Sequence, residues 1–306
     1  MNVGYRDFGA FLKEHFAGKV QKISINAGFS CPNRDGTKGV GGCTYCNNQT
    51  FNPAYCSPAK SVAEQLDEGK RFFARKYPDM RYLAYFQAYT NTYGAFDNIR
   101  KLYEAALGVS GVVGLIIGTR PDCMPDELLD YLSSLRQKGT FVLVEYGVET
   151  SRNDTLCLIN RGHTWEDSVD AITRTASAGI MTGAHIIAGL PGEDASDLVA
   201  TARLLSQLPL DTVKLHQLQL IKGTRLAMQV AKGDLAVKHW TVEQYIDVCL
   251  DFIRNISPTI AIERFTSQSP DELLISPRWG LKNYQFTALL NNAIARNSVV
   301  QGSALG

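Results

Sequence analysis

The sequence predicts an α/β fold with a parallel sheet, and two observations lead to that class. Six apolar, β-rich runs recur within the first 220 residues, and segments with apolar residues three and four positions apart lie between them. Strands that are this continuously apolar suit a parallel sheet that is covered on both faces. Six β/α units in order imply right-handed crossovers, which leaves a partial barrel, a full barrel and an open doubly wound sheet as possible architectures.

The individual elements follow in chain order. The expected strands are 20–28, 82–89, 112–118, 141–148, 182–190 and 212–220, and the expected helices are 61–77, 96–107, 125–139, 164–179 and 194–208. Start and stop signals support several of them. Thr164 can cap its helix together with Asp167, and Gly139 and Gly179 suit helix ends.

The alternation of apolar strand runs and amphipathic helices becomes less regular after residue 221. A helix is expected at about 241–254, a short apolar run at 259–265 and a closing helix at about 282–296. No Pro-, Gly- or Ser-rich linker divides the chain. We therefore expect a core over 1–225 and a C-terminal extension over 226–306 that packs on the same domain.

Composition excludes several classes of protein. The 306 residues are 45% hydrophobic and 20% charged with a formal net charge of +1, which argues against a disordered chain and against a dominant non-specific nucleic-acid surface. No apolar run reaches the roughly 18 residues of a membrane span, and the first residues lack a secretory signal, so we expect a cytoplasmic protein. Seven cysteines without a secretion signal indicate metal or redox chemistry rather than a disulfide framework.

Three of these cysteines form the strongest motif. Cys31, Cys43 and Cys46 stand in a C-x11-C-x2-C pattern directly after the first expected strand, where β/α folds carry their chemistry. Three thiolates can hold three irons of a [4Fe–4S] cluster and leave the fourth iron open, because full ligation takes four cysteines. The alternative is a structural zinc ion completed by Cys56, and spacing alone leaves both possibilities open.

The loop resembles that of the radical S-adenosylmethionine (SAM) enzymes. More closely, the chain resembles the YhcC-like radical SAM proteins, which are relatives of the catalytic subunit of Elongator. The match covers roughly residues 5 to 290 and is carried by GFSCPNRDG, GGCTYCNN, FQAYTNTYG, GTRPDC, EYGVET, NRGHT, HIIAGLPGE, LHQLQLIKGT and ERFTSQSP. The resemblance implies a partial (β/α)6 TIM-like barrel with a C-terminal helical extension. It also implies reductive cleavage of SAM to a 5′-deoxyadenosyl radical that abstracts hydrogen from a substrate.

The resemblance also implies contacts to SAM. Tyr45 matches the aromatic residue near the cluster and adenine, although a loop-packing aromatic is the plainer interpretation. Thr90, Asn91 and Thr92 occupy the place of the glycine-rich motif that receives the SAM ammonium group. They depart from that motif, yet their carbonyls and side chains can still accept hydrogen bonds, and TNTYG is equally an ordinary turn.

Four further residues complete the expected cofactor site. Glu149 and Arg161 resemble a pair that contacts SAM in anaerobic coproporphyrinogen oxidase, with Arg161 suited to a carboxylate. His185 and Ile187 match the strand motif that passes along the adenine, although a strand histidine is more often a core residue. The sequence does not assign Arg120, Asp122 or Cys123 to a role.

The substrate is predicted only by analogy. Elongator-like relatives modify tRNA, which makes tRNA or a nucleotide the leading substrate class, with a small metabolite as the alternative. A low-potential electron donor of the flavodoxin or ferredoxin type is the expected partner, and no membrane partner is expected. The rival from another class is a zinc-stapled binding module without catalysis. The oligomeric state is not predicted.

Overall fold

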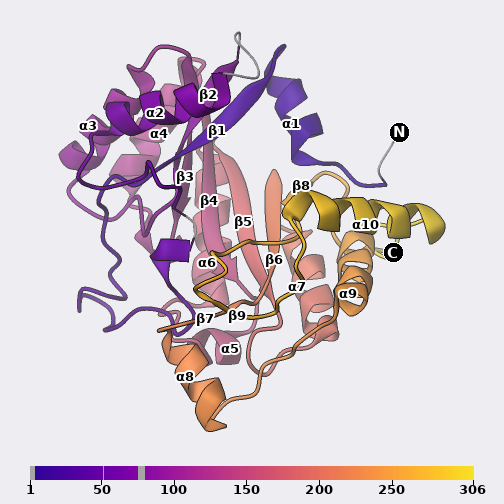
Figure 1. The fold of residues 1–306 in the computed structure, drawn as a ribbon. Coiled ribbons are helices and arrows are strands. Elements are labelled where there is room, and N and C mark those ends of the chain that lie inside the picture. The colour runs from indigo at the N-terminus through magenta and orange to yellow at the C-terminus, as the bar shows by residue number, and fades with distance from the viewer. Residues whose placement is uncertain (1–3, 51, 75–79) are drawn as a thin grey trace.

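The computed structural model describes residues 4–50, 52–74 and 80–306, which form an α/β half-barrel (Figure 1). Seven parallel strands are hydrogen-bonded in the order β1-β2-β3-β4-β5-β6-β8, and β7 and β9 form a small antiparallel sheet. The strands are β1 (Val20–Ile25), β2 (Arg81–Phe86), β3 (Val112–Thr119), β4 (Phe141–Glu149), β5 (Met181–Ala188), β6 (Thr212–Gln217), β7 (Leu220–Ile221), β8 (Ala261–Arg264) and β9 (Leu274–Ser276).

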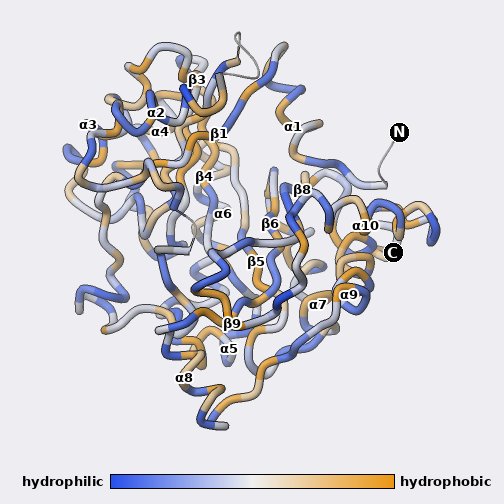
Figure 2. The backbone as a smooth tube through the Cα atoms, viewed as in Figure 1, coloured by the Kyte–Doolittle hydropathy of each residue, from blue (hydrophilic) through white to orange (hydrophobic). Residues whose placement is uncertain are grey.

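The helices cover the outside of the curled sheet or extend its ends. They are α1 (Phe8–His15), α2 (Val62–Ala74), α3 (Phe96–Leu107), α4 (Asp126–Gln137), α5 (Asn153–Leu158), α6 (Trp165–Ser177), α7 (Ala195–Leu205), α8 (Arg225–Lys232), α9 (Val242–Asn255) and α10 (Asn283–Arg296), with short 3-10 turns η1 (Asn48–Thr50) and η2 (Pro121–Cys123). Hydrophobic residues line α7 and α9, which pack side by side (Figure 2). None of the helices in the described ranges is long and apolar enough to cross a membrane.

The expected barrel and its helical extension are confirmed. The six expected strands form in order, and Thr164 and Asp167 make the reciprocal hydrogen bonds of a capping box at the start of α6. The expected helix 61–77 is described only to Ala74, and the rest of it lies outside the described residues.

The C-terminal part contributes more to the sheet than we expected. The run 259–265 contains β8, which pairs in parallel with β6 through Val213 and Ile262. A seventh strand therefore extends the barrel beyond the six β/α units. Sequence periodicity does not reveal it because β8 has only four residues and two of them are charged.

An unexpected helix, α1, closes one end of the barrel interior. Its apolar residues pack against inward-facing side chains of β2, β3, β4, β5 and β8, and its Phe11 is 1% exposed. This apolar layer lies toward the amino-terminal half of the strands, since it includes Phe141 and Met181, the first residues of β4 and β5.

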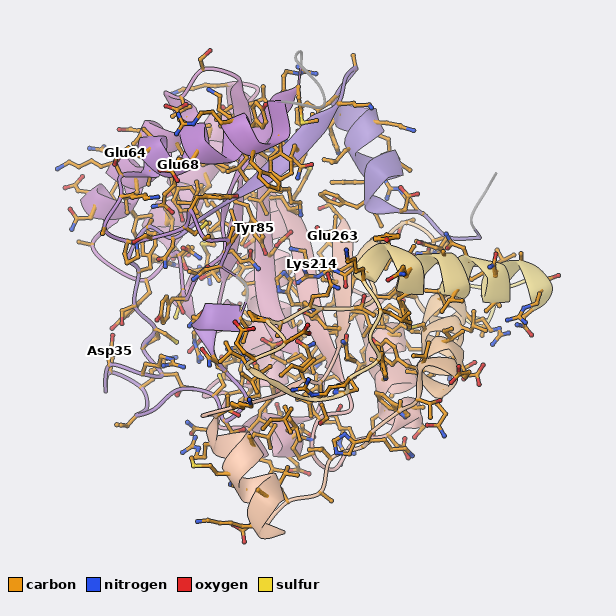
Figure 3. The ribbon with its side chains drawn as sticks, in the orientation of Figure 1. Asp35, Glu64, Glu68, Tyr85, Lys214 and Glu263 are labelled. Atoms are coloured by element: carbon orange, nitrogen blue, oxygen red, sulfur yellow. The ribbon has the colours of Figure 1, made fainter. Side chains whose placement is uncertain are left out.

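A charged layer lies next along the strands, between the apolar layer and the strands' carboxyl ends. The Glu145 carboxylate of β4 is 2.5 Å from Lys214 Nζ and 3.2 Å from Lys22 Nζ, and Lys214 Nζ is 3.2 Å from the carboxylate of Glu263. Lys22 also pairs with Glu263, which joins the two edge strands β1 and β8. Lys214 donates to the hydroxyl of Tyr85 (2.9 Å), and Figure 3 shows Tyr85, Lys214 and Glu263 gathered inside the curled sheet.

Candidate functional site

A cavity opens above the charged layer, at the carboxyl ends of the strands. Its walls come from the cysteine loop, from the ends of β2 to β6, and from the segment that follows β8. The lining residues are Cys31, Arg34, Gly42, Cys43, Tyr45, Cys46, Asn47, Asn48, Thr50, Gln87, Tyr89, Thr90, Gly118, Thr119, Arg120, Glu145, Gly147, Glu149, Arg161, His185, Ile187, His216, Gln217, Leu218, Gln219, Ile221, Arg264, Ser267 and Ser269. Parallel β/α folds carry their chemistry at this end.

The cysteine loop places Cys31, Cys43 and Cys46 on one wall of this cavity. The loop is tied to the segment after α5, because Thr44 N donates to the carbonyl of Ile159 at 2.9 Å. Asn33 adds a second tie, since its amide donates to Asn160 O at 2.6 Å and contacts Cys43 Sγ at 3.7 Å. These contacts hold the cysteine loop against the segment after α5.

The cysteines are not arranged around one ion. Thiolates that share one zinc lie about 4 Å apart, because each Zn–S bond is about 2.3 Å in a tetrahedron. Among the residues that the structure describes, no three His, Cys, Asp or Glu side chains are grouped so that they could hold a single metal ion. Cys56 lies outside the cavity lining, and its thiol donates to the carbonyl of Ser24 at 3.0 Å. Burial raises the pKa of the Cys56 thiol to about 12.

Arg161 and Glu149 form an ion pair directly beside Cys43. Arg161 Nη2 is 3.2 Å from Glu149 Oε1 and donates to Gly147 O at 2.5 Å, while Nη1 lies 3.5 Å from Cys43 Sγ. The buried Nε of Arg161 has no hydrogen-bond partner. The guanidinium therefore retains a donor for a further acceptor.

The backbone at this pair is held in a rare conformation. Glu149 has φ 71° and follows a register shift between β4 and β5, and Asn160 has φ 53°. Non-glycine residues with positive φ cluster at functional sites, because the surrounding structure must hold them there. A Cβ on Gly147 would lie 2.4 Å from Arg161 Nη2 and 2.7 Å from Glu149 Oε1, so a side chain there would displace the ion pair from its present position.

Tyr45 and Ile187 belong to the apolar wall of the cavity. Ile187 lies in a buried cluster with Leu156 and Ile159, and Tyr45 packs against that cluster. Burial, and then the nearby Glu149 carboxylate, raise the pKa of Tyr45 well above its ordinary value. The phenol is therefore neutral and offers an apolar face with a polar end.

The three polar residues after β2 separate into two groups. Thr90 lines the cavity, and its buried hydroxyl has no hydrogen-bond partner. Asn91 and Thr92 are absent from the lining. The Asn91 amide donates to Phe86 O (3.0 Å) and Gly118 O (2.7 Å), which ties the ends of β2 and β3, and the Thr92 hydroxyl lies 2.5 Å from that of Thr119. The structure thus brings Thr90, but neither neighbour, to the predicted site.

His185 connects the cavity to the charged layer. Its Nε2 lies 3.0 Å from Glu145 Oε2, and its ring makes an edge contact with the ring of His216, with centroids 5.7 Å apart. Burial, and then the charge of Lys214, lower the pKa of His185. His185 is therefore both a lining residue and a member of a polar network.

Arg120 and Asp122 form a local ion pair. Arg120 Nε and Nη2 lie 2.9 and 3.0 Å from the two carboxylate oxygens of Asp122, and Nη1 donates to Arg161 O at 2.8 Å. Arg120 is 2% exposed, so this pairing supports the backbone on which Arg161 stands. Burial, and then the Asp122 charge, raise the pKa of the Cys123 thiol to about 12.

The sequence assigned no side chain on the wall formed by the ends of β6 and β8 to the site. His216, Gln217 and Gln219 at the end of β6, and Arg264 after it in the chain, line this wall together with Glu145. The signal was present in KLHQLQ, where four polar residues interrupt an otherwise apolar run.

This half-barrel, with three cysteines of one loop beside an arginine–glutamate pair, defines an enzyme of the radical SAM class. The chain belongs to the radical SAM superfamily, because the sequence profile described as Radical SAM superfamily matches residues 31–205, and that described as Radical_SAM C-terminal domain matches residues 210–296. The cofactors that this family implies are a [4Fe–4S] cluster and SAM.

Relatives extend this assignment over nearly the whole chain. The chain is 36% identical to Protein YhcC of Escherichia coli (strain K12) over 299 residues, covering 98% of this chain and 94% of that protein. It is 28% identical over 152 residues to the tRNA uridine(34) acetyltransferase of Methanocaldococcus jannaschii, covering 48% of this chain and 26% of that protein. The solved structure of Methanocaldococcus infernus Elp3 has a TM-score of 0.67 at 15% identity, over 93% of this chain and 64% of that chain, and so shows the fold.

Proposed function

We propose that Cys31, Cys43 and Cys46 bind one [4Fe–4S] cluster and that SAM binds beside it in the same cavity. The observation that carries this proposal is the shared wall on which the three thiols lie, next to Arg161 and Glu149. The donor set fits the cofactors. The thiols are ligands for irons, and the unpartnered Nε of Arg161 and hydroxyl of Thr90 are polar groups that a ligand can satisfy.

We propose roles in SAM binding for four of the lining residues, Arg161, Thr90, Tyr45 and Ile187. Arg161, held by Glu149 and Gly147 O, is placed to bind the carboxylate of SAM. Thr90 is placed to accept from its ammonium group, and Tyr45 and Ile187 supply apolar contact to adenine. When bound, the cluster and SAM supply a 5′-deoxyadenosyl radical, which abstracts hydrogen from the substrate. The buried walls exclude water from that chemistry.

Iron analysis tests the cluster. The chain is purified and reconstituted without oxygen, and iron, sulfide and zinc are measured together with a visible spectrum. We expect about four irons and four sulfides per chain, lost in Cys43→Ala. Cys157→Ala is the matched control, because Cys157 is exposed and outside the cavity lining, and Cys56→Ala should also retain iron. One zinc without iron in the reconstituted chain would contradict the proposal.

SAM binding is tested separately from the cluster. Arg161→Gln should weaken SAM binding by at least 10-fold while iron content is retained, because one charge-assisted contact contributes about 1.5–3 kcal/mol. Arg203→Gln is the control, since Arg203 bonds Asn255 on the outer helices. Equal SAM binding by both variants would remove Arg161 from the proposed site.

The proposed substrate is tRNA or a nucleotide. Support comes from the similarity of half the chain to a tRNA uridine(34) acetyltransferase, an enzyme named for its action on tRNA. RNA binding that falls steeply with salt is the expected result, because phosphate contacts release counterions. No RNA binding at low salt would exclude this substrate class and favour a small metabolite.

We further propose an electron donor of the flavodoxin or ferredoxin type, a core over 1–225 with an extension over 226–306, and a cytoplasmic location.

A further inference from the structure

Arg264 is the starting point, because it differs from the other arginines that line the cavity. Arg34 donates to Cys46 O at 3.0 Å, Arg120 pairs with Asp122, and Arg161 pairs with Glu149. The side chain of Arg264 makes no hydrogen bond or ion pair with any residue in the described ranges, and its buried Nε has no acceptor. A half-buried guanidinium without an acceptor is unfavourable until a ligand supplies one.

The charges around Arg264 do not neutralise it. The layer beneath the cavity holds two lysines, Lys22 and Lys214, and two carboxylates, Glu145 and Glu263, which pair with one another. That layer is balanced without Arg264. The positive charge of Arg264 is therefore in excess on this wall of the cavity.

His216 is a second unsatisfied group on the same wall. It comes from β6, the strand that pairs with β8, and its buried Nδ1 has no hydrogen-bond partner. Burial, and then the charge of Arg264, lower the pKa of His216 well below its ordinary value. A neutral imidazole can still donate one N–H to a bound anion.

The wall is held in place by the segment after β8. Gln217 donates to Ser267 O at 3.0 Å and accepts from Ser267 N at 3.0 Å. Gln219 donates to the same carbonyl at 3.2 Å and accepts from the hydroxyl of Ser269 at 2.7 Å. These bonds fix the backbone that follows Arg264, so the guanidinium stands on an ordered support.

We propose that Arg264 and His216 form a subsite for an anionic group of the substrate, a carboxylate or a phosphate. This inference rests on the proposed function, in which SAM lies at the cysteine end with Arg161. Arg264 is the last residue of the edge strand β8, whereas Arg161 lies beside the end of β4. In this proposal Arg161 binds the cofactor and Arg264 binds the substrate within the same cavity.

Anion binding tests the subsite directly. Inorganic phosphate and acetate are titrated separately into the full chain by calorimetry, with the cluster reconstituted and again without it. We expect the wild-type chain to bind at least one anion with a Kd of about 10 mM or below, and Arg264→Gln to bind it at least 10-fold more weakly. Arg264→Lys should bind it with intermediate affinity, because it keeps the charge but loses the planar fork. Arg296→Gln, at the exposed end of α10, should match the wild type.

The outcomes separate the alternatives. Preference for phosphate identifies a nucleotide-type group, and preference for acetate identifies a carboxylate. Equal binding by Arg264→Gln and the wild type, or no wild-type binding of either anion, would overturn the proposal. Loss of SAM binding in Arg264→Gln would also overturn the proposal, because Arg264 would then belong to the cofactor site. Failure to assemble a cluster would refute the proposed function alone, because the titration without cluster still tests the subsite.

Discussion

Replacing Glu145 with glutamine should destabilise the fold through charge alone. The substitution preserves shape but leaves Lys214, which is 2.5 Å away, and Lys22 with only Glu263 as a carboxylate partner. Because burial would otherwise favour a neutral carboxyl, the charges of Lys214 and Lys22 are what lower the pKa of Glu145 well below its ordinary value. Breaking a buried pair by removing one partner costs about 3–5 kcal/mol.

The expected change in melting temperature follows from the chain length. With about 2.1 cal/mol/K of unfolding entropy per residue and 306 residues, about 3–5 kcal/mol lowers Tm by about 5–8 °C. Thermal unfolding at neutral pH, followed by circular dichroism, measures this shift. The control is Asp97→Asn, which removes a carboxylate from an exposed pair with Arg100 and should change Tm by about 1 °C or less.

A double variant tests the physical reason. Glu145→Gln combined with Lys214→Met restores charge balance between Lys22 and Glu263, and should melt above Glu145→Gln alone. If Glu145→Gln melts within about 1 °C of Asp97→Asn, burial of charge in this layer does not control stability, and the reasoning is refuted.

Two further substitutions give separate tests. Gly147→Ala should weaken SAM binding by at least 10-fold, because its Cβ would lie 2.4 Å from Arg161 Nη2, whereas Gly18→Ala meets no atom within 4 Å and should bind SAM normally. Unchanged SAM affinity in Gly147→Ala would show that SAM binding does not require the Arg161 guanidinium in its present position. Asp122→Asn tests acid stability, because Arg120 and then Lys38 overcome the opposing effect of burial and lower the pKa of Asp122 from 3.8 to about 2. A carboxylate whose pKa is lowered in the folded protein stabilises the fold at pH values above its ordinary pKa. The wild type should therefore have a higher urea midpoint than Asp122→Asn at pH 5, and this difference should shrink as the pH falls toward 2. A difference that does not change with pH would contradict the expectation.

The sequence predicted most of the barrel because its strands are continuous apolar runs between amphipathic helices. The strand β8 escaped prediction because it has only four residues, two of them charged, and Glu263 pairs with Lys22 and Lys214, which only the closed barrel brings near. Likewise α1 is short, and its apolar face packs against the inner side of strands that are distant in sequence, so local periodicity does not predict it.

The candidate site was predicted where local motifs determine it and not where long-range contacts do. The cysteines were found from spacing within 16 residues, and they line one cavity. Asn91 and Thr92 differ from Thr90 because they are the central residues of a turn that Tyr93 N closes by donating to Thr90 O at 3.1 Å. Their partners, Gly118 and Thr119, lie 27 residues away, which no local pattern encodes.

The position of β8 has a consequence for the order in which the chain folds. Asp7 forms a bridge with Ile262, and Gly4 O accepts from Gln301 N at 2.9 Å, so both ends of the described chain meet at this strand. During synthesis the open edge of β6 has no neighbour until residue 264 has left the ribosome. Unpaired strand edges associate with one another, and closure across such long loops is slow. A nascent or truncated chain that ends near residue 225 should therefore depend on chaperones, and the final segment should convert an aggregation-prone intermediate into the native protein.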